Sequence, residues 1–113
     1  MRYAYKDTAN GNQVISTLSS LEGCDQVCVS HSTFLIGDKG KGSGSKAHRD
    51  RINKMLELGY DSAICTVVAS NEAQNKIMDK FGWVKVHSFK SSKTGNTVQV
   101  YVLDLTKLRA KSI

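Results

Sequence analysis

Hydrophobic and polar residues follow two different periods along this chain. Residues 97–105 alternate, with Val98 and Val100 among the apolar positions, and alternation of this kind predicts a β-strand. Residues 83–89 alternate in the same way, and residues 91–96 between the two runs contain the small and polar residues of a turn. The C-terminal part of the chain is therefore expected to form a β-hairpin.

The middle of the chain has a helical spacing instead. Residues 43–58 place Ile52 and Met55 on one side of a helix and mostly charged residues elsewhere. Gly59 follows, which is a common residue just beyond the end of a helix. Residues 62–68 are then almost wholly apolar or β-branched, so we expect a buried strand after this helix.

A second helix is predicted over residues 71–81. Asn71 is a suitable N-cap, and Gln74 stands three residues later, at the position that completes a capping box. Gly82 is placed to end the helix. This segment therefore links the strand at 62–68 to the hairpin.

In the N-terminal part of the chain, the spacing of hydrophobic residues separates strands from helices less sharply. Residues 1–6 are expected to form a short strand, residues 7–12 a turn, and residues 26–36 a long strand. Residues 13–21 are expected to form a short amphipathic helix. Its apolar positions are Val14, Ile15, Leu18 and Leu21.

The order strand, helix, strand, helix, hairpin predicts an α/β or α+β domain in which helices flank one sheet. The chain of 113 residues has no internal repeat and is expected to form a single domain, residues 1–113. No apolar run reaches the roughly 18 residues of a membrane span. The segment Met1–Lys6 has no signal-peptide core, so a cytoplasmic location is expected.

A glycine-rich loop joins the strand at 26–36 to the first helix. Gly40, Gly42 and Gly44 remove side chains at alternate positions, so that backbone N–H groups can approach an oxyanion. The N-terminus of the following helix adds free N–H groups and a positive dipole end. Lys39 and Lys41 add charge. The loop thus has the features of a phosphate cradle, although a plain solvent-exposed linker has a similar composition.

Two common phosphate motifs do not fit this loop. A P-loop needs four residues between its glycines followed by Gly-Lys-Ser/Thr, and the Rossmann motif G-x-G-x-x-G would need its third glycine one residue later. The segment Lys39–Gly44 does resemble the Arg/Gln-x-x-Gly-x-Gly/Ala signature of the GCN5-related N-acetyltransferase (GNAT) superfamily. Lys39 replaces the usual Arg or Gln.

The resemblance covers roughly residues 24–105. Asn71 begins a segment similar to the N-x-x-A helix of the family, and Gly82 and Trp83 match its Gly-Phe exit with Trp in place of Phe. The loop, the Asn and the Gly-Trp pair occur in the family's order and at its distances. The resemblance implies a single mixed, mostly antiparallel sheet flanked by helices, with a parallel strand pair that splays apart.

The resemblance also implies a binding site for acetyl-CoA as cosubstrate, without a metal. In the family the pantetheine arm enters the splay like an additional strand, the loop amides hold the pyrophosphate, and the Asn reaches the arm. Carried onto this sequence, the cofactor-binding residues are Phe34, Leu35, Ile36, Lys39, Gly40, Lys41, Gly42, Ser43, Gly44, Ser45 and Asn71. Core packing for the first three and helix capping for the last are open alternatives.

The catalytic residues are less clear than the cofactor site. Many members have a Tyr acid seven residues after the Asn, but Met78 occupies that position and cannot donate a proton. The strand before the loop lacks the family's Glu and offers Cys28, Ser30, His31 and Ser32. His31 has a suitable intrinsic pKa for a general base. A structural His31 and a proton path through water are the alternatives.

The net charge bears on the possible ligands and partners, and the cysteine content bears on a zinc site and on disulfides. A net charge of +6 favours an anionic ligand or partner without choosing among coenzyme A, nucleic acid and acidic proteins. Cys24, Cys28 and His31 lack a second ligand pair, so a structural zinc site is not expected, and the odd cysteine count argues against a disulfide framework.

Only about 23 residues precede the part that resembles the family, whereas members commonly carry several elements there. An open acceptor side would favour a protein or nucleic-acid amine over a small metabolite, and a partner subunit, as in a homodimer, could complete the site. The leading prediction is an acetyl-CoA-dependent N-acetyltransferase. The alternative is a non-catalytic module of the same fold that binds coenzyme A, nucleic acid or a protein.

Overall fold

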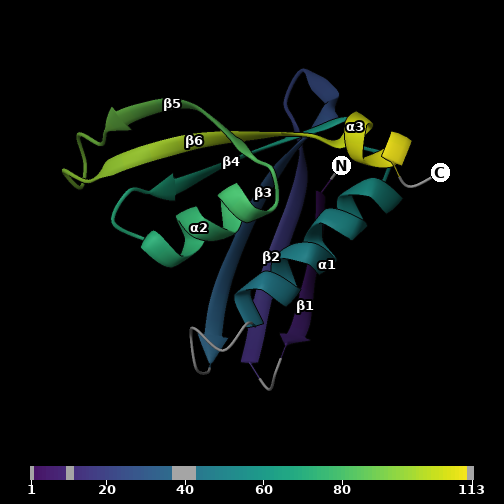
Figure 1. The fold of residues 1–113 in the computed structure, drawn as a ribbon, viewed down its shortest axis with the longest axis horizontal. Coiled ribbons are helices and arrows are strands. Elements are labelled where there is room, and N and C mark those ends of the chain that lie inside the picture. The colour runs from purple at the N-terminus through teal and green to yellow at the C-terminus, as the bar shows by residue number, and fades with distance from the viewer. Residues whose placement is uncertain (1, 10–11, 37–42, 112–113) are drawn as a thin grey trace.

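The computed structural model describes residues 2–9, 12–36 and 43–111. These residues form one six-stranded sheet in the order β1-β2-β3-β4-β6-β5, together with three helices (Figure 1). The strands are β1 (Arg2–Ala9), β2 (Asn12–Leu21), β3 (Cys24–Ile36), β4 (Ser62–Val68), β5 (Val84–Lys90) and β6 (Thr97–Asp104). The helices are α1 (Ser43–Glu57), α2 (Glu72–Lys80) and α3 (Leu105–Lys111). The predicted fold class, a mixed and mostly antiparallel sheet with helices, is confirmed.

The helix predicted for residues 13–21 is wrong, because this segment forms β2. It pairs antiparallel with β1 on one side and with β3 on the other, so its main chain is hydrogen-bonded along both edges. Val14, Ile15 and Thr17 are β-branched and favour strand conformation, which pairing on both sides reinforces. Gly23, with φ of 86°, then makes the tight turn into β3.

The strands β3 and β4 run parallel for a short distance only. They are paired from Val27 and Ser62 to Val29 and Ile64, after which β3 continues to Ile36 and β4 to Val68 without further pairing to each other. The parallel strand pair that splays apart, implied by the family resemblance, is therefore present. It divides the sheet into a β1–β2–β3 part and a β4–β6–β5 part.

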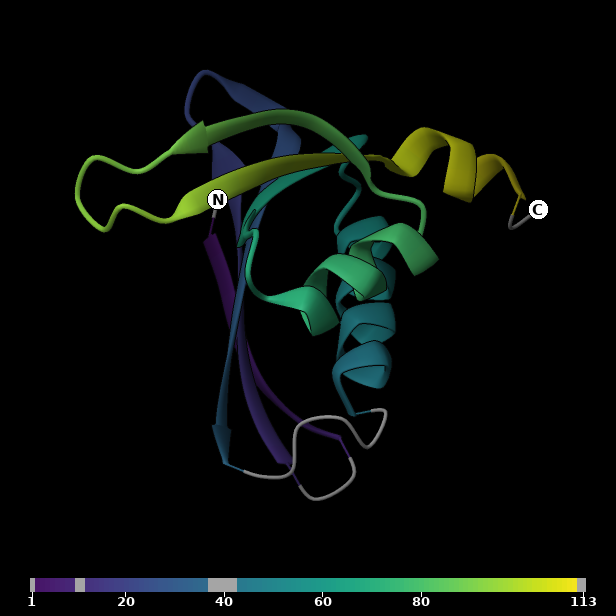
Figure 2. The same cartoon turned by 60° about the vertical axis from the view of Figure 1, so that its left-hand side comes forward.

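The helices α1 and α2 both lie on one side of the sheet (Figure 2). Their apolar residues pack with alternate residues of the strands in one core, which includes Leu18, Met55, Met78, Trp83 and Leu103. Both predicted helix ends are confirmed, since Gly59 and Gly82 have φ of 87° and 86°. The opposite face of the sheet receives none of these helices.

The C-terminal hairpin of β5 and β6 is confirmed, but the helix α3 that follows was not predicted. Asp104 caps α3, because its Oδ1 accepts the backbone N–H of Thr106 at 3.0 Å. Arg109 of α3 donates to the carbonyl oxygens of Tyr60 at 2.7 Å and Leu56 at 3.3 Å, at the end of α1. Among the described residues, no helix is long and apolar enough to cross a membrane.

Candidate cofactor and acyl-transfer site

The gap between β3 and β4 is the central feature of the candidate site. Beyond the Val29–Ile64 pair, β3 runs for seven more residues (30 to 36) and β4 for four (65 to 68). The edges of the two strands that face each other in this part make no strand pairing with one another. Free N–H and C=O groups along a strand edge can pair with an extended, amide-containing molecule.

The predicted cofactor residues Phe34, Leu35 and Ile36 form the end of β3, beyond the last pair with β4. This position agrees with the expectation that their main chain borders the splay. Their role in cofactor binding remains a prediction.

The first turn of α1 contains Ser43, Gly44 and Ser45, three further residues of the predicted cofactor set. This turn has no acidic side chain, whereas the first turn of α2 contains Glu72. The positive end of the α1 dipole is therefore not neutralised by a carboxylate of its own first turn. The remaining loop residues of the predicted set, Lys39, Gly40, Lys41 and Gly42, lie outside the described residues.

Asn71 caps α2, as the sequence predicted. Its side-chain oxygen accepts the backbone N–H of Gln74 at 3.2 Å. The Gln74 side chain does not complete a capping box but donates to the sulfur of Met78 at 3.5 Å. The capping role of Asn71 is thus confirmed, and its contact with a pantetheine arm remains a prediction.

Asn75 is a positioning residue that the sequence analysis missed. Its amide nitrogen donates to the carbonyl oxygens of Asn71 at 2.9 Å and of Val68 at 3.2 Å, which ties the start of α2 to the end of β4. Its oxygen accepts the hydroxyl of Tyr101 on β6 at 2.6 Å. Asn75 therefore holds the segment that carries Asn71 against the sheet.

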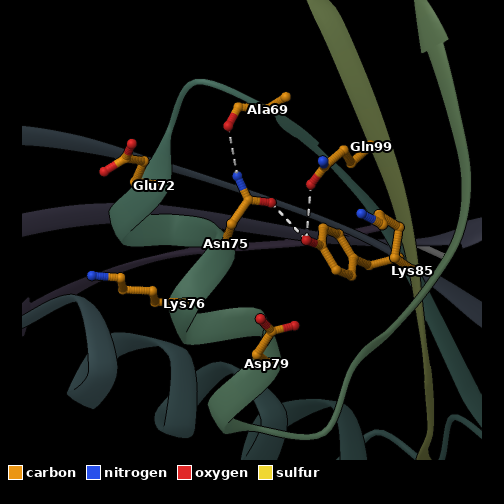
Figure 3. Close-up of a pocket in the computed structure, with 8 residues that line it drawn as sticks. Ala69, Glu72, Asn75, Lys76, Asp79, Lys85 and Gln99 are labelled. Atoms are coloured by element: carbon orange, nitrogen blue, oxygen red, sulfur yellow. Dashed lines mark hydrogen bonds between the residues drawn. The ribbon is translucent and has the colours of Figure 1, made fainter.

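A pocket of about 340 Å³ opens between α2 and the β5–β6 hairpin, beside Asn75 (Figure 3). The helix side of its lining has carboxylates and one ammonium group, and the strand side has Lys85, Gln99 and Tyr101. Residues 72, 75, 76 and 79 of α2 line it, whereas Asn71, the predicted cofactor contact of this segment, is not among the lining residues. The pocket is thus separate from the predicted cofactor contacts of α2.

His31 lies on β3, two residues after the last pair with β4, and its side chain is exposed. Its neighbours Cys28 and Ser30 are buried on the helix side of the sheet, so alternation places His31 on the side away from the helices. The candidate base is therefore beside the start of the gap, on the open face. Its catalytic role stays a prediction.

Met78 is fully buried, in the position where many family members have the acid. It belongs to the common core, together with Trp83 and Tyr101. A thioether has no proton to donate, so this position supplies no general acid.

A buried polar cluster lies at the contact between α1 and α2. The sequence analysis also missed this cluster. The indole N–H of Trp83 donates to His48 Nε2 at 2.8 Å, and Arg51 Nη2 lies 3.0 Å from His48 Nδ1. Burial, assisted by the Arg51 cation, lowers the pKa of His48 to about 3. The imidazole is therefore neutral and structural. The sequence did indicate that His48 faces the core, because His48 stands four residues before Ile52 and shares its helix face.

The cysteine side chains do not favour a covalent route. Burial raises the pKa of the Cys28 thiol to about 11 and that of Cys65 to about 12, so both are protonated at neutral pH and are poor nucleophiles. Cys24 is exposed, and none of the three is in a disulfide. In the described part of the chain, no group of three or more His, Cys, Asp or Glu residues could hold a metal ion.

Comparison with known proteins finds the similarity in structure and not in sequence. No protein-family model matches the chain, and no curated protein matches it significantly. An N-acetyltransferase from Staphylococcus aureus Mu50 superimposes with a TM-score of 0.73 at 20% identity, over 92% of this chain and 67% of that one. An acetyltransferase of the GNAT family from Streptococcus pneumoniae gives 0.68 at 17% identity, over 84% and 61%.

A third structure contains a ligand. The protein yncA of Salmonella typhimurium, a candidate acetyltransferase solved with its cofactor acetyl-CoA, superimposes with a TM-score of 0.71 at 14% identity, over 84% of this chain. The present chain spans 65% of the length of yncA. The protein therefore has the fold of the GCN5-related N-acetyltransferase superfamily, which confirms the resemblance seen in the sequence at the level of the fold.

Proposed function

We propose that this protein is an acetyl-CoA-dependent N-acetyltransferase that transfers an acetyl group to a primary amine. The observation that supports it most is the β3–β4 gap, whose unpaired strand edges suit an amide-containing pantetheine arm. The acid-free first turn of α1, preceded by the glycine-rich loop, suits a pyrophosphate. The donor groups of the site thus fit both halves of acetyl-CoA.

Acetyl-CoA would supply an activated thioester, and the chain would supply position and proton transfer. Transfer requires a neutral amine, since a protonated amine has no lone pair for attack on the carbonyl. His31 is the proposed base, because it is exposed at the start of the gap. With Met78 in place of an acid, the leaving thiolate would depart without a proton from this position, which its low basicity permits.

The proposed acceptor is an amine on a protein or nucleic acid, in the cytoplasm where acetyl-CoA is available. Exposure of His31 on the open face supports a large acceptor, and the net charge of +6 suits an acidic one. The second candidate function is a non-catalytic module that binds coenzyme A, and the buried Met78 at the acid position favours it.

Thermal unfolding with and without acetyl-CoA tests the proposal first. A ligand at about 100 times its Kd adds ~2.7 kcal/mol, which for this chain length raises Tm by roughly 10 °C. No shift at millimolar acetyl-CoA would exclude the cofactor. A shift without acetyl transfer, measured by mass spectrometry of a cell extract incubated with labelled acetyl-CoA, would favour the non-catalytic module.

Two substitutions locate the binding. Gly44→Val places a side chain in the first turn of α1, where helical backbone accepts valine, so it should abolish the shift without unfolding the protein. Lys39→Ala should only weaken binding, and Lys93→Ala, which removes the same charge from the β5–β6 turn, is the matched control. Normal binding by Gly44→Val would show that the loop is a linker.

A further inference from the structure

The pocket between α2 and the β5–β6 hairpin has no role in the proposed acetyl transfer. Its volume of about 340 Å³ is within the range of small-molecule sites. Residues of β5 and β6 form its strand wall, whereas the gap that suits acetyl-CoA is bordered by β3 and β4. An occupant of this pocket would therefore be a second ligand, and its chemistry has to match the groups on the two walls.

Three oxygen atoms share one hydroxyl hydrogen where α2 meets β6 in this pocket. The Tyr101 hydroxyl lies 2.6 Å from Asn75 Oδ1 and 3.0 Å from Gln99 Oε1, but a phenol has a single hydrogen to donate. The amide nitrogen of Asn75 donates to the carbonyl oxygens of residues 68, 69 and 71, which fixes the Asn75 oxygen toward Tyr101. The hydroxyl hydrogen therefore goes to Asn75. Within the described residues, no other donor reaches Gln99 Oε1, so this oxygen can accept a hydrogen bond from a ligand.

A carboxylate adds negative charge beside these oxygens. Asp79 of α2 lines the same pocket, and burial and, after it, the Asp79 charge raise the pKa of the Tyr101 phenol. In the part of the chain that the structure describes, Asp79 forms no ion pair with a lysine or arginine. This end of the pocket is therefore rich in acceptors and poor in donors. A primary ammonium group complements it, because it has three N–H donors and a positive charge.

Lys85 places the opposite charge on the strand wall of the pocket (Figure 3). Its register with Tyr101 directs its side chain to the helix side of the sheet. Among the described residues, no hydrogen bond or ion pair joins the Lys85 ammonium group to Asp79 or Tyr101, so Lys85 does not neutralise the acceptor-rich end itself. The charged ends of Glu72 and Lys76 point away from Lys85 (Figure 3). The Lys85 charge is thus available to a carboxylate of a ligand.

We propose that this pocket binds a free amino acid through both of its charged groups, with the ammonium group against Asp79 and Gln99 and the carboxylate against Lys85. A simple anion such as phosphate would meet the Asp79 carboxylate, and a polyamine would meet the Lys85 ammonium group. A ligand with both signs of charge opposes neither group. The site involves neither the β3–β4 gap nor acetyl-CoA, so it stands independently of the proposed function.

Amide chemical-shift titrations of the full chain test the inference with four probes of equal carbon number. Norvaline and δ-aminovalerate carry both charges at different separations, pentylamine carries only the ammonium group, and valerate carries only the carboxylate. At least one of the two amino acids should bind at millimolar concentration or below. It should bind at least about tenfold more tightly than pentylamine and valerate, since each of these lacks one charge-assisted hydrogen bond. The largest shifts should centre on residues 75, 79, 85 and 99.

Two substitutions separate the contributions of the two charges. Asp79→Asn should weaken the binding of both the amino acid and pentylamine by at least about tenfold, because it removes the partner of the ammonium group. Lys85→Gln should weaken the amino acid to a similar extent without weakening pentylamine. Lys90→Gln removes the same charge from β5 at a residue that does not line the pocket, so it is the matched control and should bind like the wild type.

Three results would overturn the inference. Neither amino acid could bind at millimolar concentration, or pentylamine or valerate could bind as tightly as the better amino acid, which would mean that only one charge is recognised. Unchanged binding in both Asp79→Asn and Lys85→Gln, with the spectra showing both variants folded, would place the ligand outside this pocket.

Discussion

The contact between α1 and α2 and the gap between β3 and β4 lie on neighbouring elements but are built in opposite ways. At the helix contact, even the polar side chains of His48 and Arg51 are buried. At the gap, the main chain of two adjacent strands diverges and leaves strand edges unpaired with each other. The first arrangement stabilises the fold, and the second leaves hydrogen-bonding groups available to a ligand.

This comparison predicts that substitutions at the helix contact change stability, whereas substitutions at the gap change function and leave stability almost unaltered. The four predictions below test this division. They are arranged by the expected change in the free energy of unfolding.

Trp83→Ala should have the largest effect. It removes a buried indole that packs in the core and donates to His48, so it should lower the free energy of unfolding by about 3–5 kcal/mol. Urea denaturation measures the change. Val86→Ala, which shortens a side chain that is 57% exposed, is the control and should stay within about 0.5 kcal/mol. A loss below about 1 kcal/mol for Trp83→Ala would show that the cluster is not a stabilising contact.

Lowering the pH should lower the free energy of unfolding, because His48 is neutral in the folded protein. Its pKa is lowered from 6.5 to about 3 in the folded protein, so between these values the unfolded chain binds a proton that the native one does not. Stability from this residue is complete above pH 6.5 and is lost as the pH falls toward 3, by at most about 1.4 kcal/mol per pH unit. Urea denaturation at several pH values measures this slope.

The difference between the wild type and His48→Gln isolates this contribution from that of the carboxylates, which titrate in both proteins. The variant should be less stable at pH 7 and should have the shallower slope. Parallel pH profiles of the two proteins would mean that His48 is accessible to protons in the folded state.

Asn71→Ala should have an intermediate effect. Loss of the side chain that caps α2 should cost ~1 kcal/mol. Asn53→Ala, the same change at an exposed position within α1, should cost nothing or stabilise slightly. If Asn71 also contacts the pantetheine arm, acetyl-CoA affinity should fall in Asn71→Ala by more than the stability change explains. Isothermal titration calorimetry distinguishes the two roles, and unchanged affinity would leave Asn71 with capping alone.

His31→Ala should have the smallest effect on stability, within about 0.5 kcal/mol, because the side chain is exposed. If His31 is the base, turnover should nevertheless fall by about 10²–10⁴ with acetyl-CoA affinity unchanged. The acid limb of the pH–rate profile should disappear with it. Equal turnover of variant and wild type at neutral and high pH would remove His31 from the mechanism.

Elements with a strong local pattern were predictable from the sequence, and elements defined by their neighbours were not. The strand at 62–68 and the helix that begins at residue 43 were found because apolar spacing and a terminal glycine coincide there. In residues 13–21, the spacing of Leu18 and Leu21 fits a helix. The segment is nevertheless a strand, because its main chain is hydrogen-bonded to β1 and β3. The pattern along one segment contains no information about partners on both sides.

The candidate site shows the same limit. Gly59, Gly82 and Asn71 could be assigned because their local roles, the ends of two helices and a helix cap, are properties of a few adjacent residues. His48 and Trp83 are 35 residues apart, and Asn75 and Tyr101 are 26 apart, so their hydrogen bonds depend on the assembled fold. The helix α3 was missed although Asp104 is a recognisable cap, because the alternating run before it was extended through Leu105.

The hydrogen bonds of Arg109 have a consequence for the order in which the chain acquires its structure. The carbonyl oxygen of Leu56, at the end of α1, accepts from a side chain 53 residues further along. A ribosome adds about 5–20 residues per second, so α1 is exposed for several seconds before the residue that secures its last turn has been made. During this interval the C-terminal end of α1 is open to fraying. Vectorial synthesis thus makes this end one of the last parts of the molecule to become fixed.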